Sequence, residues 1–94
     1  MSREETPPPQ PKRIAVVWSP EARADLRAID RETALQILHG LDRYLLHREG
    51  DVKKLKPPRT DFRLRCGDYR LFFDPAGADA IRITGVLNRK DAYR

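Results

Sequence analysis

Two short stretches of strand-like sequence, joined by a glycine-containing turn, constrain this chain more than any other feature. In residues 62–66 the order Phe-Arg-Leu-Arg-Cys puts apolar side chains on one face of a strand and arginines on the other. Gly67 and Asp68 can supply a tight turn, and residues 69–74 have the composition of a second strand. We therefore predict a β-hairpin with one face on a core and one cationic face.

Two further strands are predicted from apolar runs rich in β-branched residues. The first covers residues 14–18, and the last covers residues 80–87, after a loop at residues 75–79. Residues 53–58 contain three lysines followed by two prolines, and we interpret them as a basic connector because the prolines prevent a helix from continuing.

Two helices are predicted between the first strand and this connector. Ser19 can cap a short helix that runs to about residue 29, with Pro20 at its first position. Asp30 can cap a second and longer helix, which Gly50 can end. Apolar residues follow the helical period through that second helix, namely Ala34, Ile37, Leu38, Leu41 and Leu45. Gly40 within it indicates close packing against a neighbouring element.

The predicted elements define an α+β domain in the order β-α-α-β-β-β, with an antiparallel sheet and two helices packed on one face. The 94 residues are enough for one such domain. We assign residues 13–94 to it and interpret residues 1–12 as a disordered proline-rich arm, because they contain almost nothing to bury.

Charge is distributed unevenly along the chain. Residues 1–52 contain eight Lys or Arg and nine Asp or Glu, whereas residues 53–94 contain eleven and five. This asymmetry favours a polyanionic partner for the second half, although a basic face also serves solubility. Cys66 is the only cysteine, and the two histidines lack ligand spacing, so we predict no metal and no cofactor. With no long apolar run, the cytoplasm is the expected location.

Several segments together resemble the RelE/ParE superfamily of bacterial type II toxins. They are the Trp18-Ser19-Pro20-Glu21-Ala22 start, the Lys54-Leu55 pair, the Arg65-Cys66-Gly67-Asp68-Tyr69-Arg70 segment and the terminal Asn88-Arg89-Lys90-Asp91-Ala92-Tyr93. The resemblance covers residues 13–94. It implies a RelE-like fold and a ribosome-dependent endoribonuclease that cuts messenger RNA and is silenced by a cognate antitoxin. DNA would be a partner only through the antitoxin complex.

The resemblance also implies a set of site residues. In this family, attack of a ribose 2′-hydroxyl on the adjacent phosphate needs positive charge on the phosphorane and groups that move protons, without a metal. The implied catalytic residues are Arg63, Arg65, Arg70, Arg89 and Tyr93. The implied contacts to RNA and ribosome are Lys53, Lys54, Lys56, Arg59, Lys90 and Arg94.

The chain departs from the family pattern at two places. Relatives often carry lysine where this chain has Arg63 or Arg65, and histidine where it has Asn88. Because arginine is a poor general base, Tyr93 takes that role, or catalysis rests mainly on positioning and charge, or the protein is a weaker nuclease. Two alternatives stay open: a ParE-like inhibitor of DNA gyrase, and an adaptor that binds RNA or protein without catalysis.

Overall fold

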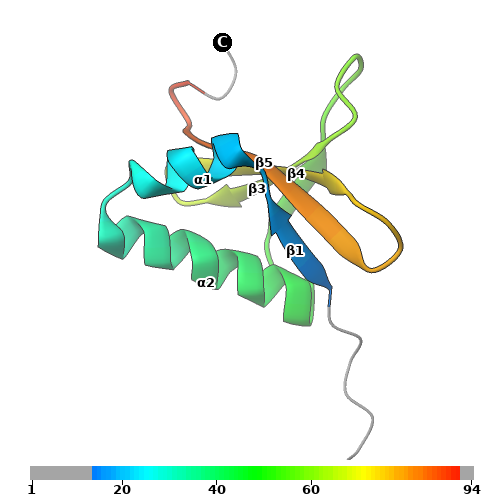
Figure 1. The fold of residues 1–94 in the computed structure, drawn as a ribbon, viewed down its shortest axis with the longest axis horizontal. Coiled ribbons are helices and arrows are strands. Elements are labelled where there is room, and N and C mark those ends of the chain that lie inside the picture. The colour runs from blue at the N-terminus through cyan, green and yellow to red at the C-terminus, as the bar shows by residue number, and fades with distance from the viewer. Residues whose placement is uncertain (1–13, 92–94) are drawn as a thin grey trace, which may run out of the picture.

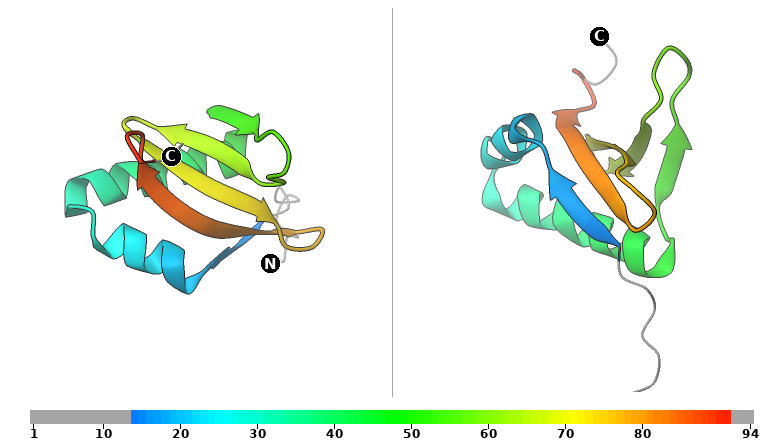
Figure 2. Two further views of the ribbon diagram at one scale, coloured as in Figure 1. Left: turned by 90° about the horizontal axis from the view of Figure 1, so that it is seen from above. Right: turned by 45° about the vertical axis from the view of Figure 1, so that its right-hand side comes forward.

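The computed structural model describes residues 14–91, which form two helices and a five-stranded sheet. The predicted α+β class is confirmed, and both helices cover one side of the sheet while the other side stays open (Figures 1 and 2). The predicted arm at residues 1–12 lies outside the described residues. In chain order the elements are β1 (Ala15–Trp18), α1 (Pro20–Arg27), α2 (Arg31–His47), β2 (Asp51–Lys54), β3 (Phe62–Cys66), β4 (Tyr69–Pro75) and β5 (Ala80–Asn88).

The sheet is mixed and not wholly antiparallel, in the order β1-β5-β4-β3-β2. Its four C-terminal strands form an antiparallel meander, but β1 pairs parallel to β5, with Ala15 opposite Ala80 and Trp18 opposite Ile83. The prediction was wrong here because the order of elements along the chain does not encode the direction in which two strands far apart in the sequence pair. A parallel pair needs a long connection, and here that connection comprises both helices and the strands β2, β3 and β4.

Strand β2 corrects a second prediction. Residues 51–54 pair with β3, Lys53 lying opposite Arg63 and Lys54 opposite Phe62, so the supposed basic connector at residues 53–58 begins as a strand. Only Val52 in this strand is apolar, and an edge strand with one half-buried residue leaves little pattern in the sequence. The loop to β3 therefore covers residues 55–61.

The N-terminal ends of both helices follow the predicted capping, whereas α2 ends before the predicted stop at Gly50. The Ser19 hydroxyl accepts a hydrogen bond of 3.0 Å from the Ala22 amide, and the Asp30 carboxylate accepts one of 3.1 Å from the Thr33 amide. Helix α2 ends at His47 because Arg48 adopts a left-handed backbone conformation with φ of 58°. No helix within residues 14–91 is both long enough and apolar enough to cross a lipid bilayer.

The core lies between the helices and the sheet. Its fully or nearly buried members are Ala22, Ile37, Leu41, Leu64, Leu71, Phe73, Ile83 and Val86. Gly40 lets α2 approach β3 closely, because a Cβ atom at that position would lie 3.2 Å from the Cys66 Sγ atom. The predicted close packing at Gly40 is confirmed, and Cys66 contributes to the core as expected.

Strand β5 contains an irregularity where it passes α1. Phe72 pairs with Gly85 but Phe73 pairs with Ile83, so Thr84 is an extra residue that forms a bulge. Beyond the bulge, the Val86 amide donates a hydrogen bond of 3.0 Å to the Asp25 carboxylate of α1. This bond joins the helical layer directly to the strand that pairs with both β1 and β4.

Candidate functional site

The open side of the sheet carries the arginines of the predicted hairpin. In the register of β3 and β4, Arg63 lies opposite Phe72 and Arg65 lies opposite Arg70, so these four residues share the face away from the helices. Lys53 of β2 is paired with Arg63 and extends the same face. The prediction of an apolar face and a cationic face is confirmed for this hairpin, with Leu64, Leu71 and Phe73 in the core.

A cavity of about 480 Å³ opens where β2, the loop 55–61, β3 and β4 meet. Apart from Leu55, every lining residue is a cation: Lys53, Lys54, Lys56, Arg59, Arg63 and Arg70. We call this space the cationic cavity. Four of these residues, Lys53, Lys54, Lys56 and Arg59, are ones that the family resemblance implies for contact with RNA or ribosome. The other two, Arg63 and Arg70, are ones that it implies for catalysis. So many positive charges around one concavity favour a polyanionic ligand.

Arg63 is a buried member of the cationic cavity, with only 8% of the residue exposed. One terminal nitrogen lies 3.4 Å from the Asp51 carboxylate of β2, and the buried Nε atom has no acceptor within the described part of the protein. A guanidinium whose donors are only partly satisfied can donate further hydrogen bonds to an anion that enters the cavity.

Arg70 is equally buried but is held differently. Its Nη1 donates to the carbonyl oxygens of Gly67 and Tyr69 at 3.0 and 3.1 Å, so the side chain stabilises the hairpin turn. Gly67 has φ of 60°, which glycine adopts without steric cost. Arg70 therefore supports the structure of the hairpin and also contributes positive charge to the cationic cavity.

Three residues of this region were not identified from the sequence: Phe72, Asp51 and Asp61. Phe72 is only 2% exposed although it lies on the open face, and the Arg59 guanidinium carbon sits 4.8 Å from the centre of its ring. Asp61 forms two hydrogen bonds to Arg59, at 3.0 and 2.6 Å. The alternation in the sequence placed Arg63 and Arg65 on one face, but it did not indicate that a loop would cover part of that face.

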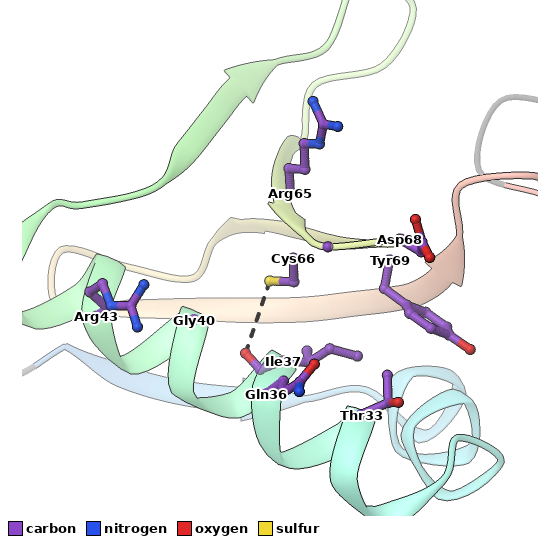
Figure 3. A pocket seen from close by; sticks show the side chains of 10 residues that line it. Thr33, Gln36, Ile37, Gly40, Arg43, Arg65, Cys66, Asp68 and Tyr69 are labelled. Atoms are coloured by element: carbon purple, nitrogen blue, oxygen red, sulfur yellow. Dashed lines mark hydrogen bonds between the residues drawn. The ribbon is translucent and has the colours of Figure 1, made fainter.

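The structure does not bring every predicted catalytic residue into the cationic cavity. Arg65 is exposed and points away from α2, on the opposite side of its strand from Cys66 (Figure 3). Arg89 and Lys90 follow β5, where the Arg89 amide donates a hydrogen bond of 2.7 Å to the Asp68 carbonyl oxygen and the Arg89 side chain is not among those lining the cavity. Tyr93 and Arg94 lie outside the described residues.

A second cavity of about 480 Å³ lies on the helical side of the hairpin, between α2 and the turn at Gly67 (Figure 3). Cys66 points into this space toward α2, with its Sγ atom 4.0 Å from the Ile37 carbonyl oxygen. Burial raises the pKa of the Cys66 thiol to about 11, and the nearby positive charge of Arg70 offsets part of that effect. Across residues 14–91, no three His, Cys, Asp or Glu side chains cluster closely enough to hold a metal ion.

The raised pKa makes Cys66 slow to alkylate. At pH 8 we expect iodoacetamide to react roughly a hundredfold more slowly with the folded protein than with the chain in urea, because the reactive thiolate is scarcer. The rate in the folded protein should keep rising up to a pH of about 11, whereas the unfolded chain should level off near its ordinary pKa of 9.0. Equal rates in the two states would contradict this result.

Comparisons with known proteins agree with this architecture. Residues 16–93 match the family described as the ParE toxin of the type II toxin-antitoxin system, parDE. Comparison with curated protein sequences gave no match. The RelB-RelE antitoxin-toxin complex of Methanococcus jannaschii contains a chain with 25% identity and a TM-score of 0.67, the alignment covering 82% of this chain and 94% of that one.

Two further solved structures show the same fold. The RelE-RelB complex of Pyrococcus horikoshii matches with 24% identity and a TM-score of 0.66, over 84% of this chain and 98% of that one. The chromosomal ParDE system of P. aeruginosa matches with 18% identity and a TM-score of 0.55, over 83% and 98%. The family match covers most of the chain, and with the shared fold it shows that this protein belongs to the RelE/ParE superfamily of type II toxins.

Proposed function

We propose that this toxin cleaves messenger RNA on the ribosome and so inhibits translation. The observation that carries the proposal is the cationic cavity, in which six basic side chains surround one space and the buried Arg63 has a donor without an acceptor in residues 14–91. Arginine forks match the geometry of phosphate oxygens and stay charged at any physiological pH. A phosphodiester of single-stranded RNA is the ligand that fits this chemistry.

The proposed reaction is attack of a ribose 2′-oxygen on the adjacent phosphorus. The bond between phosphorus and the 5′-oxygen breaks, the 2′-hydroxyl loses its proton, and the leaving 5′-oxygen gains one, which gives a 2′,3′-cyclic phosphate. Arg63 and Arg70 would stabilise the negative charge that develops on the phosphorane. The Lys53 ammonium, paired in register with Arg63, can donate the proton to the leaving oxygen.

The remaining predicted residues have supporting roles in this proposal, including Arg65 and Arg89, which the family resemblance implies to be catalytic. Lys54, Lys56 and Lys90 would bind backbone phosphates of messenger or ribosomal RNA. Arg65 and Arg89 lie near the hairpin turn and would contact the next phosphates along the strand. Tyr93 and Arg94 stay predictions, with Tyr93 assigned to base stacking or to removal of the 2′-proton.

A cognate antitoxin is the protein partner that we propose. The solved relatives from M. jannaschii and P. horikoshii are described as complexes of RelE with RelB. By analogy, this toxin would be held inactive in the cytoplasm by a protein encoded beside it, and it would meet DNA only through that complex. Co-expression with the adjacent short reading frame should restore the growth of cells that produce the toxin.

The direct test is cleavage of a defined transcript. Purified toxin is incubated with ribosomes programmed with that transcript, and the 5′ ends of the fragments are mapped by primer extension. We expect new ends within the codon that occupies the decoding site and none when ribosomes are omitted. Intact transcripts at an excess of toxin would refute the proposal.

Inhibition of DNA gyrase is the second candidate function. It is supported by the description of the matching family as ParE toxin, and by the position of Arg65 and Arg89 outside the cationic cavity. Binding to gyrase needs no catalytic constellation. Loss of supercoiling by purified gyrase at stoichiometric toxin, with transcripts left intact on ribosomes, would favour this function over RNA cleavage.

A further inference from the structure

Arg59 is held in an arrangement that differs from that of the other cations in the cationic cavity. Its guanidinium lies over the Phe72 ring, with the central carbon 4.8 Å from the ring centre. Phe72 is 2% exposed, so the side of the ring toward solvent is covered. The Arg59 side chain itself is 47% exposed, and its exposed part borders the cavity.

Asp61 fixes the plane of this guanidinium. Its two carboxylate oxygens accept bonds from Nε and Nη2 of Arg59, at 3.0 and 2.6 Å, and its side chain is only 13% exposed. Such a two-point contact allows one orientation of the planar group. The loop is also braced by its backbone, because the Leu55 amide donates to the Asp61 carbonyl oxygen and the Arg59 amide donates to that of Lys56.

This arrangement suits a flat ligand better than a phosphate. One of the two edges with which the guanidinium could form a fork with phosphate, Nε with Nη2, is already occupied by the Asp61 carboxylate, which also offsets its charge. The exposed part of the side chain therefore has a flat face and the remaining Nη1 donors to offer a ligand. Planar guanidinium groups stack on nucleobases in complexes with single-stranded RNA.

We propose that Arg59, backed by Phe72 and oriented by Asp61, is a stacking platform for one nucleobase of single-stranded RNA. The base would lie on the solvent side of the guanidinium, giving a three-layer stack of phenyl ring, guanidinium and base. Its backbone phosphate would then fall among the lysines of the cationic cavity. The inference rests on the RNA ligand proposed above and adds a contact to the base, which a purely electrostatic cavity lacks.

The experiment compares RNA with and without bases at constant phosphate number. Binding of a fluorescein-labelled short single-stranded RNA and of its abasic counterpart is measured by anisotropy at low salt. We expect the wild-type toxin to bind the abasic strand roughly tenfold more weakly, the usual effect of losing one stacked base. Arg59→Lys keeps the charge but removes the plane, and it should bind both strands with the same low affinity.

Arg82→Lys is the matched control, because Arg82 is an exposed arginine on β5 and lies outside the cationic cavity. It should keep the wild-type difference between the two strands. Thermal unfolding of each variant checks the fold. A second measurement needs no variant: 2-aminopurine in the RNA should lose fluorescence on binding wild-type toxin, because stacking quenches it.

The platform is refuted if wild-type toxin binds both strands equally, if it binds neither, or if Arg59→Lys keeps the full difference. These outcomes are separate from those of the cleavage assay. If the toxin discriminates against abasic RNA through Arg59 but leaves transcripts intact, the stacking platform is supported and the proposed nuclease activity is refuted. If the toxin cleaves transcripts but binds abasic and normal RNA equally, the nuclease activity is supported and the stacking platform is refuted.

Discussion

Arg63→Gln is expected to lower transcript cleavage on programmed ribosomes by about a hundredfold or more. Arg63 is 8% exposed and its Nε atom has no acceptor in the described structure, so this donor is left for a phosphate in a poorly hydrated setting. Removing a single charged or polar group that stabilises a developing anion costs about 3 kcal/mol in transition-state free energy. The measurement is the rate of appearance of the mapped fragment at saturating ribosomes.

Two further variants serve as controls for Arg63→Gln. Arg82→Gln removes one positive charge from an exposed site elsewhere on the sheet and should cleave at the wild-type rate. Arg63→Lys keeps the charge at the buried site and should recover part of the activity, because ammonium contacts phosphate without the fork. Full activity in a folded Arg63→Gln protein would remove Arg63 from the catalytic assignment.

Leu71→Ala is expected to destabilise the toxin by about 3 kcal/mol. Leu71 has no exposed surface and lies on β4, between β3 and β5, against the helical layer. Truncation of such a side chain removes buried apolar contacts and leaves a cavity, which typically costs about 2 to 5 kcal/mol. For a domain of this size the melting temperature should fall by roughly 15 °C. Urea unfolding followed by circular dichroism measures the free-energy change.

Leu46→Ala makes the same chemical change at a surface position. Leu46 is 60% exposed on α2, so the variant should differ from wild type by less than about 0.5 kcal/mol. A similar loss of stability at both positions would show that Leu71 does not have the core role assigned to it.

The sequence predicted local structure well because local structure follows from local patterns. Ser19 and Asp30 cap their helices as expected, and the hairpin at Gly67 forms between the two predicted strands. Gly40 marks a close approach of α2 to β3. Each of these features depends on residues close together in the chain or on the constraints of a single residue type.

Features that depend on distant pairing were missed. Strand β2 has one apolar residue, Val52, and exists because β3 offers an edge with which it can pair. The parallel contact of β1 with β5 joins residues about sixty-five positions apart, for example Ala15 and Ala80. No periodicity within either strand encodes the direction in which it meets the other.

In the candidate site, too, local features were predicted from the sequence and features that depend on distant contacts were not. Alternation placed Arg63 and Arg65 on one face, but it gave no reason for Arg63 to be buried and Arg65 exposed. The difference arises because β2 and the loop 55–61 surround Arg63, whereas Arg65 lies toward the hairpin turn. From the sequence, Phe72 is simply a residue of a predicted strand. Its contact with Arg59 forms only because the loop 55–61 folds over this face of the sheet.

The bond between Asp25 and the Val86 amide has a consequence for how the sheet meets other chains. β5 has nine residues and β1 only four, so beyond Ile83 the side of β5 toward β1 is left without a strand. Helix α1 lies there, and the Asp25 carboxylate occupies a backbone donor that an incoming strand would need. Self-association through that stretch is thereby blocked, and in the described structure a visiting strand can lengthen the sheet at the outer edge of β1 or of β2.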